Sequence, residues 1–361
     1  MCAVAFVGIA LSLVSTVNSI EKDEIFKELW QITAGIGVGS ATNRHTVQPY
    51  SYVNSPRENV LPLGMATNKP KEESKSENTE QEKDDPEEPP FVPEIQGHPV
   101  VSLDMSEQQT KDRLLCKNES KYSVDVNQYA KSEYPLKLSV PASAPNTETP
   151  VILIIHTHGT ECYLEEGQKY YDSSTPTRSH DKEKNVVAVG KTLADTLNGL
   201  GIPTLHVDIM FDEKSYSDSY SLSEKAVMEY IEKYPSIQYV FDVHRDSVVR
   251  ENSEKIKPLT LIDNLPTAQA MFVVGTDSKG ANHPQWTTNL TVASIFQYRL
   301  TEKYGNLMRP INIRAASFNA EHAAGSLLIE IGTCGNTLSE AKNCAVLLGQ
   351  TIAEIILNDG L

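Results

Sequence analysis

Two histidines and a glutamate follow an apolar run in the middle of the chain. Residues 151–155 read V-I-L-I-I, and His156, His158 and Glu161 come directly after them. A continuous apolar run of this length is typical of a strand that is buried in a parallel sheet. Because ligands of open α/β sheets bind at the carboxyl ends of strands, we expect these side chains to form one wall of an active site.

Two later apolar segments carry groups with matching chemistry. Residues 237–243, I-Q-Y-V-F-D-V, run into His244 and Arg245, and residues 326–332, S-L-L-I-E-I-G, enclose Glu330. Neutral imidazoles and carboxylates are ligands of zinc, and three such groups with one open position make a hydrolytic site. A carboxylate within an apolar strand is costly to bury in its ionised form, so Glu330 is a candidate general base with a raised pKa.

Alternating strand and helix patterns must position these groups. From residue 151 onward this alternation predicts an α/β domain with a doubly wound, mostly parallel sheet that is flanked by helices. Helix ends are predicted at Gly201 as a left-handed C-cap, at Ser223 as an N-cap, and at a capping box of Thr337 and Glu340. Further strands are predicted at 203–207, 259–263 and 270–275.

The first 98 residues differ in composition from the rest. Residues 1–20 contain no charged side chain, which indicates a signal peptide or a membrane anchor. Residues 69–94 are rich in Glu, Lys, Ser and Pro, so they cannot bury enough apolar surface to offset the entropy of ordering. We therefore predict an anchor at 1–20, an extracytoplasmic spacer at 21–98 with a disordered acidic linker at 69–94, and a catalytic domain at 99–361.

The overall charge argues against one class of partner. The 361 residues have a formal net charge of -16, and no basic stripe is visible along the sequence. Recognition of the phosphate backbone needs a clustered positive surface, so we expect no binding of nucleic acid.

Four motifs resemble a known family, and they occur in the same order along the chain. They read H-T-H-G-T-E-C-Y, D-V-H-R-D-S, F-V-V-G-T-D and L-L-I-E-I-G-T-C-G-N-T-L-S-E-A. In these stretches the chain resembles stage II sporulation protein P, a zinc-dependent cell-wall hydrolase related to the N-acetylmuramoyl-L-alanine amidases. The resemblance covers roughly residues 115–361, and residues 1–114 match only in having an apolar start and a polar spacer.

The resemblance implies a set of metal ligands. The first zinc ligand of the wider amidase family corresponds to His158, and the third corresponds to His244. The second, a glutamate shortly before the first long helix, corresponds to Glu183, with Glu161 and Asp181 as rivals. His156 is left either as a further ligand or as a group that orients a ligand or the substrate, since positions i and i+2 of a strand face the same side.

The resemblance also implies catalytic roles for two residues. Glu330 corresponds to the catalytic glutamate, which polarises the attacking water and then protonates the leaving amine. Arg245 either binds substrate carboxylates or the developing oxyanion, or holds Asp246 in place. His322 is either a substrate-side group or a solvated surface residue.

The function implied is a zinc-dependent N-acetylmuramoyl-L-alanine amidase that hydrolyses peptidoglycan, with endopeptidase activity as a secondary expectation. The resemblance also implies a role in engulfment during sporulation, beside a lytic transglycosylase partner. The expected location is outside the cytoplasm of a Gram-positive spore-former, in a membrane-anchored or secreted form. The alternatives are a zinc carboxypeptidase that acts on stem peptides and a non-catalytic scaffold that binds the cell wall.

Overall fold

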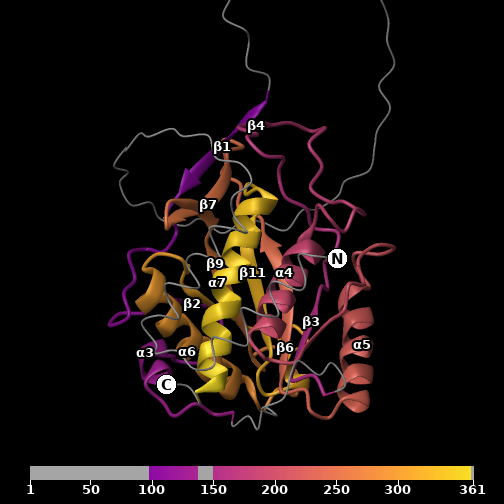
Figure 1. The fold of residues 1–361 in the computed structure, drawn as a ribbon, viewed down its shortest axis with the longest axis vertical. Helices are drawn as coiled ribbons and strands as arrows, with labels where there is room; N and C mark the ends of the chain where they lie inside the picture. The colour runs from indigo at the N-terminus through magenta and orange to yellow at the C-terminus, as the bar shows by residue number, and fades with distance from the viewer. Residues whose placement is uncertain (1–96, 137–148, 359–361) are drawn as a thin grey trace, which may run out of the picture. The chain divides into compact units, whose positions relative to one another are not determined.

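The structure is a computed structural model that describes residues 97–136 and 149–358 (Figure 1). These residues belong to one compact unit, Glu87–Leu361. The predicted anchor at 1–20 and the predicted linker at 69–94 lie outside the described residues. Among the residues that are described, none of the helices combines the length and apolar character needed to cross a membrane.

A seven-stranded sheet forms the centre of this unit. In spatial order its strands are β2 (Cys116–Asn118), β10 (Ile311–Arg314), β9 (Ala270–Gly275), β11 (Leu327–Thr333), β6 (Tyr239–Asp246), β3 (Ile152–Ile155) and β5 (Thr204–His206). Five of the six neighbouring pairs are parallel, and only β9 and β11 are antiparallel. The expected α/β sheet is therefore present and mostly parallel, but it consists of two parallel blocks that run in opposite directions.

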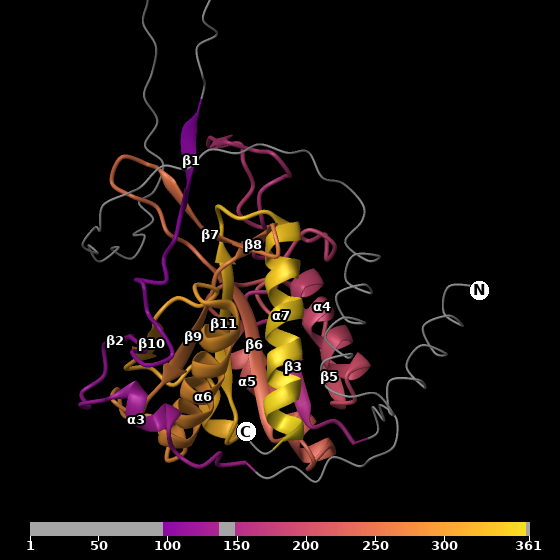
Figure 2. The same ribbon diagram turned by 60° about the vertical axis from the view of Figure 1, so that its left-hand side comes forward.

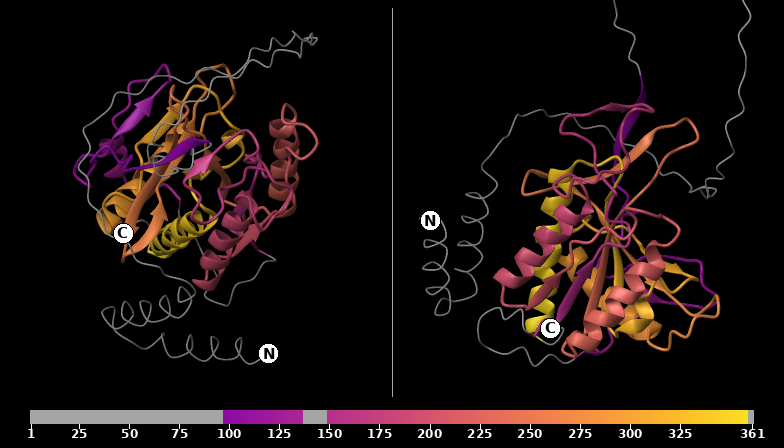
Figure 3. Two further views of the ribbon diagram at one scale, coloured as in Figure 1. Left: turned by 90° about the horizontal axis from the view of Figure 1, so that it is seen from above. Right: turned by 90° about the vertical axis from the view of Figure 1, so that its right-hand side faces the viewer.

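Helices cover both faces of this sheet. One face is covered by α4 (Val186–Gly199), α6 (Trp286–Tyr304) and α7 (Leu338–Leu357), and the opposite face by α5 (Ser219–Lys233), as Figures 2 and 3 show. A short helix, α3 (Val126–Ala130), packs beside α6. Successive side chains of β3 point to opposite faces of the sheet, so this strand contacts both helical layers. Ile152 and Ile154 belong to the large core cluster with α4, and Leu153 and Ile155 belong to the smaller cluster with α5.

A second, four-stranded sheet was not predicted. Its order is β4 (Tyr170–Tyr171), β1 (His98–Leu103), β7 (Lys255–Ile262) and β8 (Leu265–Ala268). The strand predicted at 259–263 belongs to this small sheet, where β7 and β8 form a hairpin with Asp263 and Asn264 at positive φ, as a tight hairpin turn requires. Thr333 donates a hydrogen bond of 2.6 Å to the carbonyl of Ile256, which ties the small sheet to the carboxyl end of β11.

The helix-end predictions have mixed outcomes. The capping box of Thr337 and Glu340 is present at the start of α7, and Gly201 follows α4 with φ of +87°. The prediction for Ser223 is wrong, because α5 already begins at Ser219 and Ser223 lies within it. The hydroxyl of Ser223 instead lies at hydrogen-bond distance, 2.8 Å, from the hydroxyl of Thr157, so a tertiary contact uses the group that a cap would have used.

Candidate metal centre

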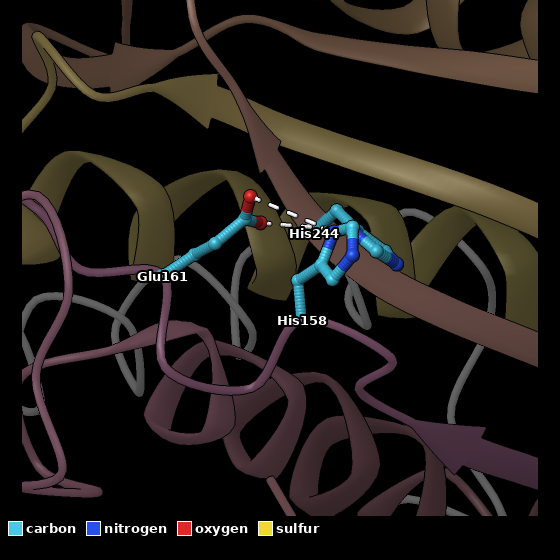
Figure 4. A group of neighbouring side chains, drawn as sticks. All are labelled: His158, Glu161 and His244. Atoms are coloured by element: carbon cyan, nitrogen blue, oxygen red, sulfur yellow. Dashed lines mark ion pairs between the residues drawn. The ribbon is translucent and has the colours of Figure 1, made fainter. Parts of the chain in front are cut away.

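Three buried side chains converge at the carboxyl ends of β3 and β6. His158, Glu161 and His244 each offer a ligand atom, and these atoms lie within 4.8 Å of one another. His158 Nδ1 is 3.9 Å from Glu161 Oε1, and His244 Nδ1 is 3.6 Å from Glu161 Oε2 (Figure 4). Ligand atoms of a tetrahedral zinc ion are about 3.3–3.5 Å apart, given bonds of about 2.0–2.1 Å. We refer to these three residues as the metal centre.

The loop after β3 is held in one conformation by its own polar groups. Thr160 donates to the carboxylate of Asp212 from its backbone N–H at 3.0 Å and from its hydroxyl at 2.5 Å. Gly159 is required for a steric reason, since a Cβ atom there would lie 2.7 Å from the Cα atom of Met210. The tight turn also carries a hydrogen bond of 3.1 Å from the N–H of Glu161 to the carbonyl of His158. The same turn therefore presents both His158 and Glu161.

The buried carboxylate of Asp242 lies next to His244. His244 Nε2 lies 2.9 Å from Asp242 Oδ1, on the side opposite to the nitrogen that faces Glu161. Asp242 also accepts hydrogen bonds from the N–H and the hydroxyl of Thr157, at 2.8 and 2.6 Å. Burial lowers the pKa of His244, but the Asp242 and Glu161 carboxylates outweigh it and raise this pKa well above its usual value. The surroundings of His244 thus favour a positive charge between these carboxylates, which a metal cation would supply.

Arg245 contacts Glu161 and the loop that follows β3. Burial raises the pKa of Glu161, but the positive charge of Arg245 and the contact with His244 lower it to about 2. The backbone N–H of Arg245 donates to Glu161 Oε2 at 3.2 Å, and its guanidinium donates to the carbonyls of Cys162 and Thr177 at 3.0 and 2.6 Å. Its side chain therefore fastens the loop after β3 and keeps Glu161 ionised. The Asp246 carboxylate is paired instead with Arg309, at 2.7 Å.

Two of the sequence candidates lie apart from the metal centre. Glu183 is exposed in the turn that precedes α4, as is Asp181, and neither belongs to the group of converging ligand atoms. Glu161, the rival candidate, occupies the place that the resemblance assigned to Glu183. The spacing in the sequence could have indicated Glu161, because a residue three positions after His158 returns to the same side of a tight turn.

His156 also points away from the metal centre. It is fully buried, with Nδ1 3.0 Å from the carbonyl of Val243 and Nε2 2.9 Å from Nε2 of His206. Both ring nitrogens are thus engaged elsewhere. The strand β3 ends at Ile155, so the alternation that would place His156 and His158 on the same side does not extend to these residues.

Glu330 lies next to the metal centre on the neighbouring strand. Strands β11 and β6 pair in parallel with Glu330 opposite His244, so the two side chains project from the same face of the sheet. Its Oε2 atom is buried and has no hydrogen-bond partner. Burial, assisted by the Asp246 carboxylate, raises the pKa of Glu330 to about 8. A carboxylate in this state can take up and release a proton near neutral pH.

Several residues around the centre were missed by sequence reasoning. Two tyrosines contact the ring of His158, Tyr216 by stacking at 4.5 Å and Tyr220 edge-on at 5.5 Å between ring centroids. Asp242 could have been found, because it precedes His244 by two residues on a strand and so faces the same side. Asp212 and the tyrosines lie in the segment between β5 and α5 and at the start of α5, where no local pattern marks them.

A second group of similar residues lies elsewhere in the described part of the chain. Glu224 on α5 and two residues of the 3-10 helix η2 (Ala320–His322), Glu321 and His322, have ligand atoms within 4.8 Å of one another. His322 Nε2 is 3.1 Å from Glu224 Oε1, in an ion pair whose side chains are 21% and 41% exposed. We refer to these three residues as the surface group.

Comparisons with known proteins agree with the motifs. The chain matches the family model of stage II sporulation protein P over residues 48–353. It is 26% identical over 226 residues to stage II sporulation protein P of Bacillus subtilis (strain 168), an alignment that covers 60% of this chain and 53% of the relative. The chain thus spans about half the length of the curated relative that it matches.

Solved amidase structures are also similar to the chain. One is the N-acetylmuramoyl-L-alanine amidase AmiC2 of Nostoc punctiforme, with 14% identity and a TM-score of 0.33, covering 58% of this chain and 96% of that chain. Another is the CwlD amidase from Clostridioides difficile in complex with the GerS lipoprotein, with 14% identity and a TM-score of 0.35, covering 58% of this chain and 97% of that chain.

Proposed function

This chain belongs to the stage II sporulation protein P family, and we propose that it is a zinc-dependent N-acetylmuramoyl-L-alanine amidase that hydrolyses peptidoglycan during sporulation. The observation that carries the proposal is the convergence of His158, Glu161 and His244, with Glu330 beside them and its Oε2 atom without a hydrogen-bond partner. The bond to be cut is the amide between the lactyl carbonyl of muramic acid and L-alanine.

The donor set fits zinc. Two imidazoles and one carboxylate are a ligand combination of hydrolytic zinc sites, and three protein ligands leave a position open. When bound, the ion would supply Lewis-acid chemistry, lowering the pKa of a water molecule and polarising the amide carbonyl. The carboxylate of Asp242 lies 2.9 Å from the far nitrogen of His244, where such a group can orient a histidine ligand, and the charge of Arg245 keeps Glu161 ionised.

Glu330 carries the proton transfers in this proposal. Its raised pKa, about 8, allows it to be protonated or ionised near neutral pH with little cost. As a carboxylate it accepts a proton from the attacking water, and as an acid it gives that proton to the nitrogen of the leaving L-alanine. The free Oε2 atom leaves an acceptor available for this role.

We extend the proposal to the cellular setting that the family suggests. The proposal includes endopeptidase activity in the same site and an extracytoplasmic location. It also includes action in engulfment beside a lytic transglycosylase. The uncharged residues 1–20 would provide the membrane attachment, or would be removed on secretion.

Digestion of purified cell wall by the purified full chain tests the proposal. We expect release of peptides with a free L-alanine amino group and the matching free lactyl carboxyl groups on the glycan. New C-terminal D-alanine without lactyl ends would identify the carboxypeptidase alternative instead.

The Glu330→Gln variant is the matched control for this digestion. It removes the proton carrier but keeps the size of the side chain, so we expect activity to fall by about 10²–10⁴-fold while zinc binding is retained. Undiminished wall degradation by this variant would show that the activity is not its own, which is the outcome expected of a scaffold protein.

A further inference from the structure

Tyr220 lies beside the metal centre, in the first turn of α5. Its ring meets that of His158 edge-on, with 5.5 Å between centroids and 83° between the ring planes. The ring of Phe318 lies 6.0 Å away, again between centroids. The carbonyl of Tyr220 accepts hydrogen bonds from the side chains of Asn319 and Ser223, at 2.8 and 3.1 Å. Both the ring and the backbone of Tyr220 are therefore held in place.

The segment that contacts Tyr220 has a strained backbone. Phe318 and Asn319 have φ of +57° and +58°, in the left-handed region, where a bulky residue such as Phe is an outlier. Such conformations persist only where the surrounding contacts determine them, and they cluster at functional sites. Asn319 donates to the carbonyl of Tyr220 and to the hydroxyl of Ser223, at 2.8 and 3.1 Å. Both strained residues thus contact Tyr220, which indicates that its position matters.

The hydroxyl of Tyr220 lies near the charged groups of the metal centre. Burial raises the pKa of Tyr220, and the carboxylates of Asp242, Glu330 and Glu161 raise it further. Charges act on a group in this way only at short range, so the phenol oxygen is close to these carboxylates. Within residues 97–136 and 149–358, no acceptor is found for this hydroxyl. Its proton is therefore available to a bound molecule.

Other hydrogen-bond donors at the centre are already engaged by the protein. The guanidinium of Arg245, a candidate for binding an oxyanion, donates to the carbonyls of Cys162 and Thr177. The hydroxyl of Tyr163 donates to the carbonyl of Ile331 at 2.9 Å. Hydrolysis of an amide needs a free donor, because the carbonyl oxygen gains negative charge when water adds to the carbonyl carbon. The hydroxyl of Tyr220 is placed to meet this need.

We propose that the Tyr220 hydroxyl donates a hydrogen bond to the carbonyl oxygen of the amide that is cut. This inference rests on the proposed function and adds a catalytic residue to it. Water adds to the carbonyl carbon and gives its proton to Glu330, so the carbonyl oxygen becomes negative, and the bond from Tyr220 is strongest at this stage. The carbonyl then re-forms as the C–N bond breaks, and the proton passes from Glu330 to the leaving nitrogen. Tyr220 keeps its own proton throughout.

The Tyr220→Phe variant removes the donor and keeps the ring. With a muramyl peptide as substrate we expect kcat to fall about 10–100-fold and KM to change little, because the lost bond forms mainly in the transition state. The zinc affinity should not change, since the ring that contacts His158 is kept. Tyr230→Phe is the matched control, because Tyr230 lies further along the same helix and packs against the smaller core cluster. It should alter none of these values.

A binding measurement makes the test independent of turnover. A phosphinate analogue of the muramyl peptide, with phosphorus in place of the carbonyl carbon, carries the tetrahedral geometry and the negative oxygen of the intermediate. The Kd of this analogue should rise about 10–100-fold in Tyr220→Phe. The Kd of the muramyl peptide itself, measured in the Glu330→Gln background to prevent hydrolysis, should be the same with and without Tyr220→Phe.

The failures can be told apart. If the unmodified protein releases no lactyl ends from cell wall, the proposed function fails. The two Kd values need no turnover, so they decide separately whether Tyr220 is the donor. Equal losses for both ligands, an unchanged Kd of the phosphinate, or a weaker zinc affinity of Tyr220→Phe would overturn the inference. Tyr220 would then bind the substrate without preference for the intermediate, or would only support His158.

Discussion

The metal centre and the surface group contain the same kinds of side chain but differ in what surrounds them. All three residues of the metal centre are buried, whereas those of the surface group are half-buried. In the metal centre two further buried groups, Asp242 and Arg245, contact the ligands. In the surface group the contacts are a partly solvated ion pair between Glu224 and His322 and a hydrogen bond of 3.1 Å from Ser317 to Glu321 Oε1.

This difference predicts that the metal centre binds a cation more tightly than the surface group, although both contain His and Glu side chains at similar spacing. Water screens and solvates the charges of the surface group, so its carboxylates gain less from a bound cation. The buried charges of the metal centre have no such solvation, and a cation between them is favoured strongly. One oxygen of the surface group, Glu321 Oε2, lacks a hydrogen-bond partner, so a direct comparison of the two groups is informative.

Removal of one ligand charge from each group should give the largest difference. We expect Glu161→Gln to abolish stoichiometric zinc binding and with it the hydrolysis of cell wall, since a buried ligand is lost and the charge of Arg245 is left uncompensated. Glu224→Gln should retain one equivalent of zinc and full activity. Elemental analysis after dialysis and wall digestion would measure the two effects.

A third variant decides between the two candidate glutamates. Glu183→Gln should bind zinc as the unmodified protein does, because Glu183 is exposed and separate from the converging ligands. Loss of zinc from this variant, with zinc retained by Glu161→Gln, would show that the loop before α4 rearranges to supply the ligand.

A smaller effect is expected from the residue that supports His244. Asp242→Asn keeps the shape of the side chain but removes the charge that lies 2.9 Å from His244 Nε2. Losses of about 10–100-fold in metal affinity are usual when such a partner is changed, and we expect a loss in this range. Competition with a chromogenic chelator would measure it. Asp208→Asn, a change at an exposed ion pair with Lys182, should leave the affinity unaltered, and equal affinities for all three proteins would refute the role of Asp242.

Strong local patterns made much of this fold predictable. The apolar runs at 151–155, 237–243 and 326–332 overlap β3, β6 and β11, and the capping box starts α7 as expected. The placement of His244 and Glu330 at the same edge of the sheet follows from those runs, because both residues lie near carboxyl ends of parallel strands, whereas the pairing of these two strands is known only from the structure.

The rest depends on contacts between distant segments. The small sheet pairs Val100 with Lys255, two residues that no local period connects. The choice of Glu161 over Glu183 is made by the turn after β3 and by Arg245, which is 84 positions further along the chain. These are tertiary effects, and a pattern that is read in one window cannot contain them.

The buried surroundings of the metal centre should also make the fold sensitive to acid, which is the smallest effect expected. Burial lowers the pKa of His156 to about 3, with His206 acting in the same direction, and burial lowers the pKa of His206 to about 4. Because both values lie below 6.5, the unfolded chain binds more protons than the folded chain as the pH falls from 6.5 towards 4. This part of the stability is complete above pH 6.5, and it should fall by roughly 1–2 kcal/mol per pH unit below it.

Urea titrations between pH 7 and pH 5 would measure this effect, with EDTA present to remove the influence of bound metal. The free energy of unfolding of His206→Gln should decrease less steeply than that of the unmodified protein, by about 1 kcal/mol per pH unit. The exposed His180 provides the control, since His180→Gln should keep the slope of the unmodified protein. An unchanged slope for His206→Gln would show that the pair of His156 and His206 accepts a proton in the folded state without penalty.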